Sequence, residues 1–306
     1  MTRLARSAGM FIAMAATNFA ASTGTRTSAT DLVPVYRLKL EPFLASPARL
    51  AGMILKTRVN SGPPLRLLLD SGANMITLDP RAAAKSNCGA GAIDLDLVAA
   101  GTQAAAGVKQ TKAATVEIGA LRLHDLPVLI AEGGVGEGIQ GVLPLAIFSG
   151  FLIQLDVPGK TLDLLPYPAV PPQGTGNLRA LASNNLLFIK GTVNEGRDGY
   201  FLLDTGASYS AVSQAVARQL KLSEALAERV PLQAGATELN APLVGSDVRL
   251  RFGARELGFG RVVAIDLSVA SRYHNLDIAG LLGFPALSRA VLVVNYRDGL
   301  VRIDSQ

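Results

Sequence analysis

The chain is poor in the residues that build disulfides and metal centres. Its 306 residues include one cysteine, Cys88, two histidines, His124 and His274, and no tryptophan. A single cysteine excludes an internal disulfide framework. So few cysteines and histidines also argue against a structural zinc site. We therefore expect neither a metal nor a cofactor.

Charge is also scarce, at 17% of residues, and the 29 Lys and Arg exceed the 24 Asp and Glu only slightly. The basic residues form no dense run, which argues against nucleic-acid binding. Hydrophobic residues make up 49%, enough to bury a sizeable core. At about 100–200 residues per domain, the length predicts two domains or one large one. The 31 glycines and 16 prolines indicate many turns between short strands.

The first residues have the order of an export signal. Arg3 and Arg6 precede an apolar stretch over residues 8–21, and small residues follow over 20–24. This order is typical of a secretory signal peptide, so we expect residues 1–22 to be removed and the protein to be exported, to the periplasm or outside the cell. The apolar stretch is shorter than the roughly 20 residues of a spanning helix. We expect no stable membrane span elsewhere.

The chain contains a tandem repeat. Lys56–Ala73 (KTRVNSGPPLRLLLDSGA) aligns without a gap with Lys190–Ala207 (KGTVNEGRDGYFLLDTGA), at an offset of 134 and with nine identities in eighteen positions. Ile139–Pro144 (IQGVLP) matches Ile278–Gly283 (IAGLLG) at an offset of 139. The second half therefore carries about five extra residues between the two matches. Repeats of this kind indicate that one structural unit occurs twice.

Each half has the pattern of a β-rich unit. Apolar runs, turn residues and short helical stretches predict strands, hairpins and helices at matching places. The expected strands are Leu65–Leu69 and Tyr200–Leu203; the hairpins are Phe151–Leu165 and Val291–Ile303; the helices are Pro80–Lys85, Ser213–Leu220, Leu145–Phe148 and Pro285–Arg289. We predict an all-β fold with few short helices, in two lobes over residues 31–166 and 178–306. The linker, 167–177, is rich in proline and glycine.

The strongest candidates for chemistry are Asp70 and Asp204. Each ends an apolar strand and opens a turn, D-S-G-A in the first half and D-T-G-A in the second. A lone motif of this kind usually marks an Asx turn. Two copies in a duplicated chain predict a pseudo-twofold arrangement with the carboxyls side by side. Two hydroxyls that can lock the turns and two glycines that permit close approach are the expected support: Ser71, Thr205, Gly72 and Gly206.

These motifs resemble those of the aspartic proteases, the superfamily of pepsin and the retroviral proteases. Phe201–Ser213 (FLLDTGASYSAVS) is similar to the retroviral form, and Gly141 and Gly280 match the glycine that lets a strand pass behind the aspartate loop. The resemblance runs from Val35 to Ile303 and looks like two retroviral-type units fused in tandem, as in bacterial aspartyl proteases. It implies two β-barrel-like lobes of the acid-protease fold with an active-site cleft between them. Because both lobes lie in one chain, it is compatible with a monomer.

The resemblance implies an aspartic endopeptidase. A water activated by an Asp70/Asp204 dyad would hydrolyse peptide bonds of a peptide or unfolded protein bound in extended form. Flaps over the cleft would lie near Val98–Val108 and Leu232–Leu243. The alternative is a non-catalytic peptide- or protein-binding module on the same fold. Such a module would need none of the repeated aspartates, glycines and hydroxyls.

One departure from pepsin predicts a shifted pH dependence. Ala73 and Ala207 stand where pepsins carry a Ser or Thr that donates to the catalytic carboxylates. Fewer donors to the charged form raise the pKa of a carboxyl. We therefore expect peptide hydrolysis to be fastest at mildly acidic pH. A measured pH–rate profile with an optimum below about 3 would contradict this expectation.

Overall fold

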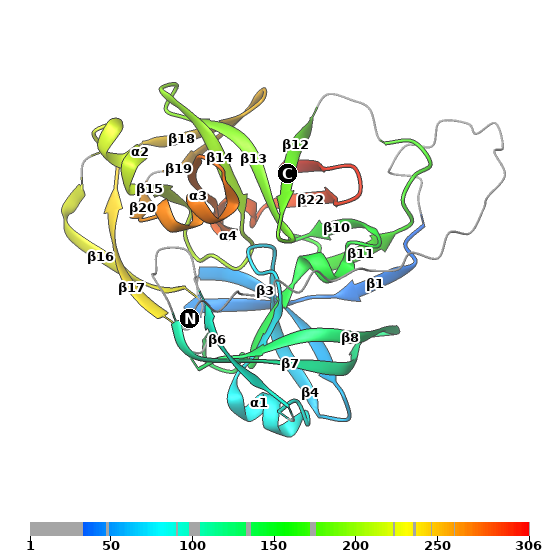
Figure 1. The fold of residues 1–306 in the computed structure, drawn as a ribbon. Helices are drawn as coiled ribbons and strands as arrows, with labels where there is room; N and C mark the ends of the chain where they lie inside the picture. The colour runs from blue at the N-terminus through cyan, green and yellow to red at the C-terminus, as the bar shows by residue number, and fades with distance from the viewer. Residues whose placement is uncertain are drawn as a thin grey trace, which may run out of the picture.

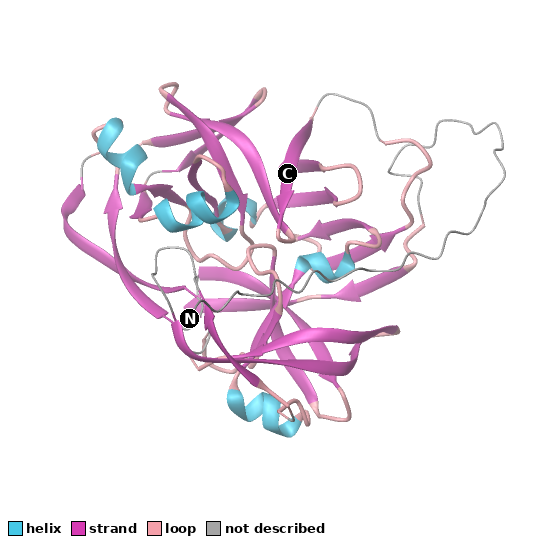
Figure 2. Cartoon of the chain, viewed as in Figure 1, coloured by secondary structure: helices cyan, strands magenta, loops and turns pink. Residues whose placement is uncertain are grey.

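The computed structural model describes residues 33–46, 49–89, 91–97, 105–132, 136–171, 176–222, 224–234, 237–245, 247–259 and 261–305. The predicted signal peptide, 1–22, lies outside these residues. The described chain is mostly β with few short helices, arranged as two sheet bodies (Figures 1 and 2), which confirms the predicted fold class. None of the helices in this part of the chain is both long and apolar enough to cross a membrane.

The first half forms an eight-stranded sheet, within which β3 also pairs with β7. Its strands in spatial order are β2 (Glu41–Ser46), β3 (Arg49–Val59), β4 (Pro64–Asp70), β9 (Gly141–Pro144), β5 (Ile76–Leu78), β8 (Leu121–Ile130), β7 (Ala105–Ile118) and β6 (Ile93–Leu97). The extra β3–β7 pairing joins strands from separate parts of the sheet, so the sheet curls toward a barrel.

The second half repeats this pattern. Its strands in spatial order are β13 (Leu186–Val193), β14 (Arg197–Leu203), β21 (Ile278–Leu282), β15 (Ala211–Ser213), β20 (Val262–Ile265), β17 (Thr237–Val244) and β16 (Glu224–Ala234). Strand β18 (Val248–Phe252) also pairs with β13, and β19 (Arg255–Phe259) pairs with β18. In both halves the strand that ends at the aspartate motif pairs antiparallel with the strand before it and parallel with the later glycine strand.

A shared layer joins the two halves. Strands β1 (Tyr36–Lys39), β10 (Leu152–Asp156) and β11 (Thr161–Leu165) come from the first half; β12 (Asn177–Ser183), β22 (Ala290–Asn295) and β23 (Leu300–Ser305) come from the second. The central contact is antiparallel, with Ile153 opposite Val294. Both predicted hairpins therefore exist, but they pair with each other. The lobe boundaries 31–166 and 178–306 stay predictions, since strands from both sides share this layer.

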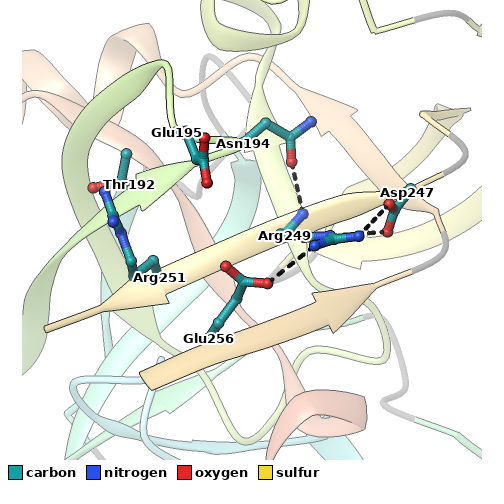
Figure 3. Close-up of a pocket in the computed structure, with 7 residues that line it drawn as sticks. All are labelled: Thr192, Asn194, Glu195, Asp247, Arg249, Arg251 and Glu256. Atoms are coloured by element: carbon teal, nitrogen blue, oxygen red, sulfur yellow. Dashed lines mark hydrogen bonds and ion pairs between the residues drawn. The ribbon is translucent and has the colours of Figure 1, made fainter. Parts of the chain in front are cut away.

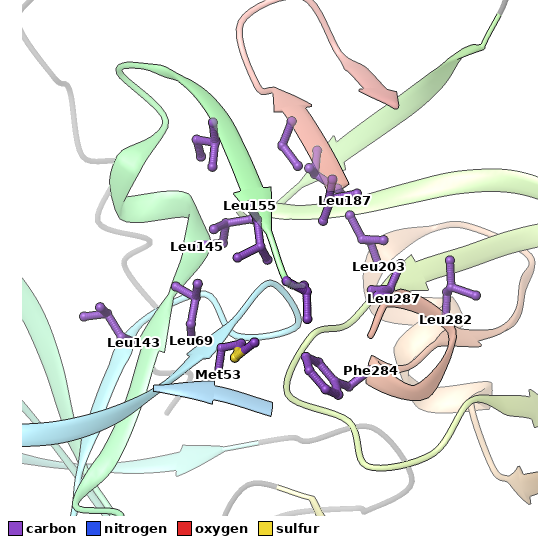
Figure 4. Close-up of a cluster of buried hydrophobic side chains, with 14 of the residues drawn as sticks. Met53, Leu69, Leu143, Leu145, Leu155, Leu187, Leu203, Leu282, Phe284 and Leu287 are labelled. Carbon is purple, nitrogen blue, oxygen red and sulfur yellow. The ribbon is translucent and has the colours of Figure 1, made fainter. Parts of the chain in front are cut away.

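One hydrophobic core continues from one half into the other. Leu69, Leu145 and Leu155 of the first half and Leu203 and Phe284 of the second belong to the same buried cluster (Figure 4). Burial of such side chains contributes about 1.5–3 kcal/mol each relative to exposure. The shared core therefore holds the two aspartate-bearing strands, β4 and β14, in a common frame.

The short helices occur where the sequence predicts them. They are α1 (Pro80–Lys85), η2 (Leu145–Phe148), α2 (Gln214–Gln219) and α4 (Phe284–Leu287). Repeat-equivalent residues begin two of them: the Asp79 carboxylate accepts from the backbone N–H of Ala82, and the Ser213 hydroxyl accepts from that of Val216. Such N-caps satisfy amides that have no partner within the helix.

The identical asparagines of the repeat have a structural role. Asn60 and Asn194 adopt left-handed backbone conformations, with φ of 49° and 45°. Their side-chain oxygens accept hydrogen bonds from the backbone N–H of Thr115 (3.1 Å) and Arg249 (2.7 Å). Each asparagine thereby ties a tight turn to a neighbouring strand. The extra length of the second half coincides with α3 (Ser268–His274).

Two glycines at strand crossings generate a stability prediction. A Cβ on Gly280 would overlap the backbone oxygen of Ala211, and one on Gly141 would overlap that of Thr77. Since these oxygens belong to packed strands, we expect Gly280→Ala and Gly141→Ala each to lower the free energy of unfolding by about 1–3 kcal/mol or more. Urea denaturation measures the change.

The matched control is Gly258→Ala at an exposed position of β19, where an added Cβ meets nothing within 4 Å. It should be near neutral, because no neighbour has to move. Equal destabilisation by Gly258→Ala and Gly280→Ala would contradict the close-approach explanation.

Candidate active site

The two predicted aspartates lie where the two halves meet. Asp70 is the last residue of β4 and pairs with Pro144 of β9, and the backbone N–H of Asp204 donates to Leu282 of β21 at 3.0 Å. In each half, therefore, the aspartate turn is backed by the strand that carries the later glycine. This matches the placement implied for Gly141 and Gly280.

Reciprocal hydrogen bonds lock the two turns together. The backbone N–H of Ser71 donates to the Thr205 hydroxyl, and the backbone N–H of Thr205 donates to the Ser71 hydroxyl, both at 3.0 Å. Each hydroxyl in turn donates across the interface, Ser71 to the carbonyl of Leu203 (2.8 Å) and Thr205 to that of Leu69 (3.0 Å). Ser71 and Thr205 are each 1% exposed, so water does not compete for these four hydrogen bonds.

The paired glycines bring each turn against the opposite carboxyl. A Cβ on Gly72 would lie 2.5 Å from Cγ of Asp204, and a Cβ on Gly206 would overlap the Asp70 carboxyl. The same glycines donate their backbone N–H groups to the aspartate of their own turn, Gly72 to Asp70 at 2.7 Å and Gly206 to Asp204 at 3.0 Å. Ala207 adds a second donor to Asp204 at 2.9 Å. Only glycine allows this approach.

The carboxyls form an electrostatically coupled pair. Burial raises the pKa of Asp70, and the backbone N–H groups of Gly72 and Gly206 partly oppose the rise. Burial and the neighbouring Asp70 charge raise the pKa of Asp204 well above its ordinary value. Two adjacent carboxylates cannot both ionise easily, so the pair retains a proton that belongs to the dyad as a whole.

The pseudo-twofold symmetry breaks next to the dyad. In the second half the backbone N–H of Gly283 donates to the hydroxyl of Ser210 at 3.1 Å. At the equivalent positions the first half has Pro144, which has no N–H, and Ile76, which has no hydroxyl. The first half thus lacks both the donor and the acceptor, so Pro144 fits within β9 without leaving a buried polar atom unpaired. Aligning the repeats at Ile76 would have revealed this pair.

The predicted flap positions fall on two hairpins, in part. Residues 98–104 and 235–236 lie outside the described residues. The flanking strands β6 and β7 pair in one hairpin, and β16 and β17 pair in the other. Val230 and Leu232 of β16 pack against the same buried cluster as Ala207 and Tyr209, which follow Asp204. The β16–β17 hairpin therefore shares an apolar surface with the Asp204 turn.

A depression of about 310 Å³ lies on the surface of the second half (Figure 3). Its charged groups largely satisfy one another: Arg249 pairs with Asp247 at 2.9 Å and with Glu256 at 3.4 Å. It carries no sign of a reactive centre. Within the described residues, no cluster of three or more His, Cys, Asp or Glu is placed to hold a metal ion.

The comparisons with known proteins agree with this geometry. The chain is similar in structure to the aspartic proteinase from the fungus Irpex lacteus, with a TM-score of 0.53 and 10% sequence identity over 84% of this chain and 94% of that one. At this identity the likeness shows the fold, which is the acid-protease fold. No curated protein sequence matches the chain.

The family follows from the sequence match. The aspartyl protease family matches residues 55–145 and 189–286, more than half of the chain and one segment from each repeat. The chain therefore belongs to the aspartyl protease family, of the retropepsin-like type.

The hydroxyl lock yields a prediction about stability. Thr205→Val removes the hydroxyl, so the buried N–H of Ser71 and the buried carbonyl of Leu69 lose their partners. Unsatisfied buried groups cost about 1–3 kcal/mol each, so we expect the free energy of unfolding to fall by about 2 kcal/mol or more. Thr205→Ser keeps the hydroxyl and is the matched control. Equal urea midpoints for the two variants would contradict the lock.

The dyad yields a prediction about pH. A carboxyl whose pKa is raised by folding binds more protons in the folded state, so stability falls as pH rises from about 3.9 through the raised pKa. Asp204→Asn removes this ionisation. We therefore expect the stability of Asp204→Asn relative to wild type to be greater at about pH 7 than at about pH 4.

Asp79→Asn is the control for loss of a carboxyl outside the dyad, because asparagine caps α1 as aspartate does. Urea denaturation at both pH values measures the free energy of unfolding of the wild type, Asp204→Asn and Asp79→Asn. A relative stability of Asp204→Asn that is the same at both pH values, or that falls as pH rises, would contradict a raised dyad pKa.

Proposed function

We propose that the chain is an aspartic endopeptidase in which Asp70 and Asp204 are the catalytic residues. The observation that carries the proposal is the reciprocal pair of hydrogen bonds between Ser71 and Thr205, which holds two carboxyls with raised pKa values next to each other. Gly72 completes the support from one turn, and Gly206 does so from the other.

The proposed reaction needs only the dyad and a water. The ionised carboxylate takes a proton from a water that lies between the two aspartates, and the water oxygen attacks the peptide carbonyl carbon. The protonated carboxyl donates a hydrogen bond to the carbonyl oxygen. As the tetrahedral intermediate breaks down, a proton passes to the leaving nitrogen and the dyad regains its single proton.

Substrate and location are parts of the same proposal. An extended peptide or unfolded protein would pair its backbone with strand edges beside the dyad, covered by the two hairpins β6–β7 and β16–β17. Both aspartates belong to one chain, so a monomer would suffice. The arrangement of residues 1–22 supports export.

A cleavage assay tests the proposal. We expect the wild-type protein to cleave a denatured protein at about pH 4–6, and Asp70→Asn and Asp204→Asn each to lower the rate by at least about 100-fold, because neither amide can take or give the proton. Asp79→Asn makes the same change outside the dyad and should keep the activity. Products are measured by mass spectrometry.

A folded wild-type protein that is inert over this range would leave the alternative, a peptide-binding module on the same fold. Full activity in either dyad variant would equally overturn the assignment of the two catalytic residues. Circular dichroism of each variant separates loss of chemistry from loss of fold.

A further inference from the structure

The hairpin β2–β3 reaches across to the opposite aspartate turn. Its strands pair from Glu41–Ile54 out to the rung Ser46–Arg49. The equivalent hairpin of the second half, β12–β13, ends at the rung Ser183–Leu186. At the repeat offset of 134, Leu186 corresponds to Gly52, so β3 extends three residues further toward the hairpin tip. The extension places Arg49 beside the other half of the molecule.

Arg49 meets the turn that carries Asp204. Its Nη1 donates to the Tyr209 hydroxyl at 2.8 Å, and its guanidinium carbon lies 5.0 Å from the centre of the Tyr209 ring. Tyr209 follows Asp204 by five residues. A hydrogen bond together with a cation–π contact holds the guanidinium in one orientation.

Tyr209 is itself fixed by the second half. Its backbone carbonyl packs so closely against Gly283 that a Cβ there would overlap it, and its side chain packs on the apolar cluster below the Asp204 turn. The tyrosine therefore acts as a rigid support. Arg49 is exposed, and its described neighbours supply no carboxylate ion pair, so its positive charge stays open to solvent beside the turn that carries Asp204.

An extended substrate would pass this charge. A peptide in β conformation advances about 3.3 Å per residue, so side chains two to four residues from the scissile bond lie about 7–13 Å away along the chain. A guanidinium that donates one N–H to a tyrosine hydroxyl keeps further N–H donors for a carboxylate. Among the described residues, the Asp70 turn has no equivalent of the Arg49–Tyr209 contact, because the β12–β13 hairpin is shorter and Met75 stands at the position equivalent to Tyr209.

We propose that Arg49, oriented by Tyr209, is a specificity-determining residue that binds the side-chain carboxylate of an acidic substrate residue on one side of the scissile bond. The inference rests on the proposed peptidase function. The asymmetry of the two hairpins confines the acidic preference to a single substrate position.

The test compares decapeptides that differ only by Glu or Gln. The cleavage site is mapped first. Glu or Gln is then placed in turn at each position two to four residues from that site, on both sides. The ratio of kcat/KM values is measured for each Glu/Gln pair of peptides. We expect wild type to favour Glu by about fivefold at one position only, as for a well-oriented, partly exposed ion pair. Arg49→Gln should abolish the preference, and Arg49→Glu should reverse it, so that Gln is favoured over Glu at the same position.

Two further variants separate recognition from structure. Tyr209→Phe keeps the ring but loses the hydroxyl, and should reduce the Glu/Gln ratio without reversing it. Arg81→Gln removes an exposed arginine of α1 and should leave both ratio and activity as in wild type. An unchanged Glu/Gln ratio in Arg49→Gln, or no Glu preference at any position in wild type, would overturn the proposal.

Binding distinguishes failure of this proposal from failure of the proposed function. Decapeptide mixtures with one fixed Glu or Gln are titrated into the Asp204→Asn chain and into the Asp204→Asn, Arg49→Gln chain by calorimetry. A Glu preference in the first that disappears in the second supports Arg49 even if wild type cleaves nothing. If the wild type cleaves peptides but shows no Glu preference that depends on Arg49, the peptidase proposal stands and the specificity role of Arg49 is wrong.

Discussion

The reciprocal hydrogen bonds between Ser71 and Thr205 are the interaction on which the site depends. Bringing two half-buried carboxyls together is unfavourable, since loss of solvent and like charge both oppose ionisation. The four bonds made by the two hydroxyl residues satisfy backbone groups that would otherwise be orphaned at the centre of the molecule. Separating the turns would expose all of these groups, so the lock resists the repulsion that the dyad creates.

The rest of the fold keeps the two turns in register. Strands β10 and β22 pair across the duplication, and the core beneath them contains side chains of both halves. The halves are nevertheless unequal around the dyad: Ser210 and Gly283 form a bond that Ile76 and Pro144 cannot, and the longer hairpin brings Arg49 to one side. Two chemically identical carboxyls therefore occupy different surroundings.

Much of this could be predicted from the repeat. Its nine identities mark Asp70 and Asp204, the strands before them and their supporting glycines, because these positions depend on local turn geometry that one repeat shares with the other. The caps at Asp79 and Ser213 are local as well. The pairing of β10 with β22 and the contact of Arg49 with Tyr209 were not predictable in this way, since each joins residues more than 130 positions apart and leaves no periodic pattern.

The sequence by itself determined the duplicated β-rich units, the two Asp-hydroxyl-Gly-Ala turns and the family to which they belong, because strand alternation, glycine and proline act through short-range sterics. Only the tertiary structure decided that the two turns interlock, that both carboxyls have raised pKa values, and that Arg49 of the first half contacts Tyr209 of the second. These depend on burial and on distances between remote side chains, which exist only once the two halves have packed on a common core.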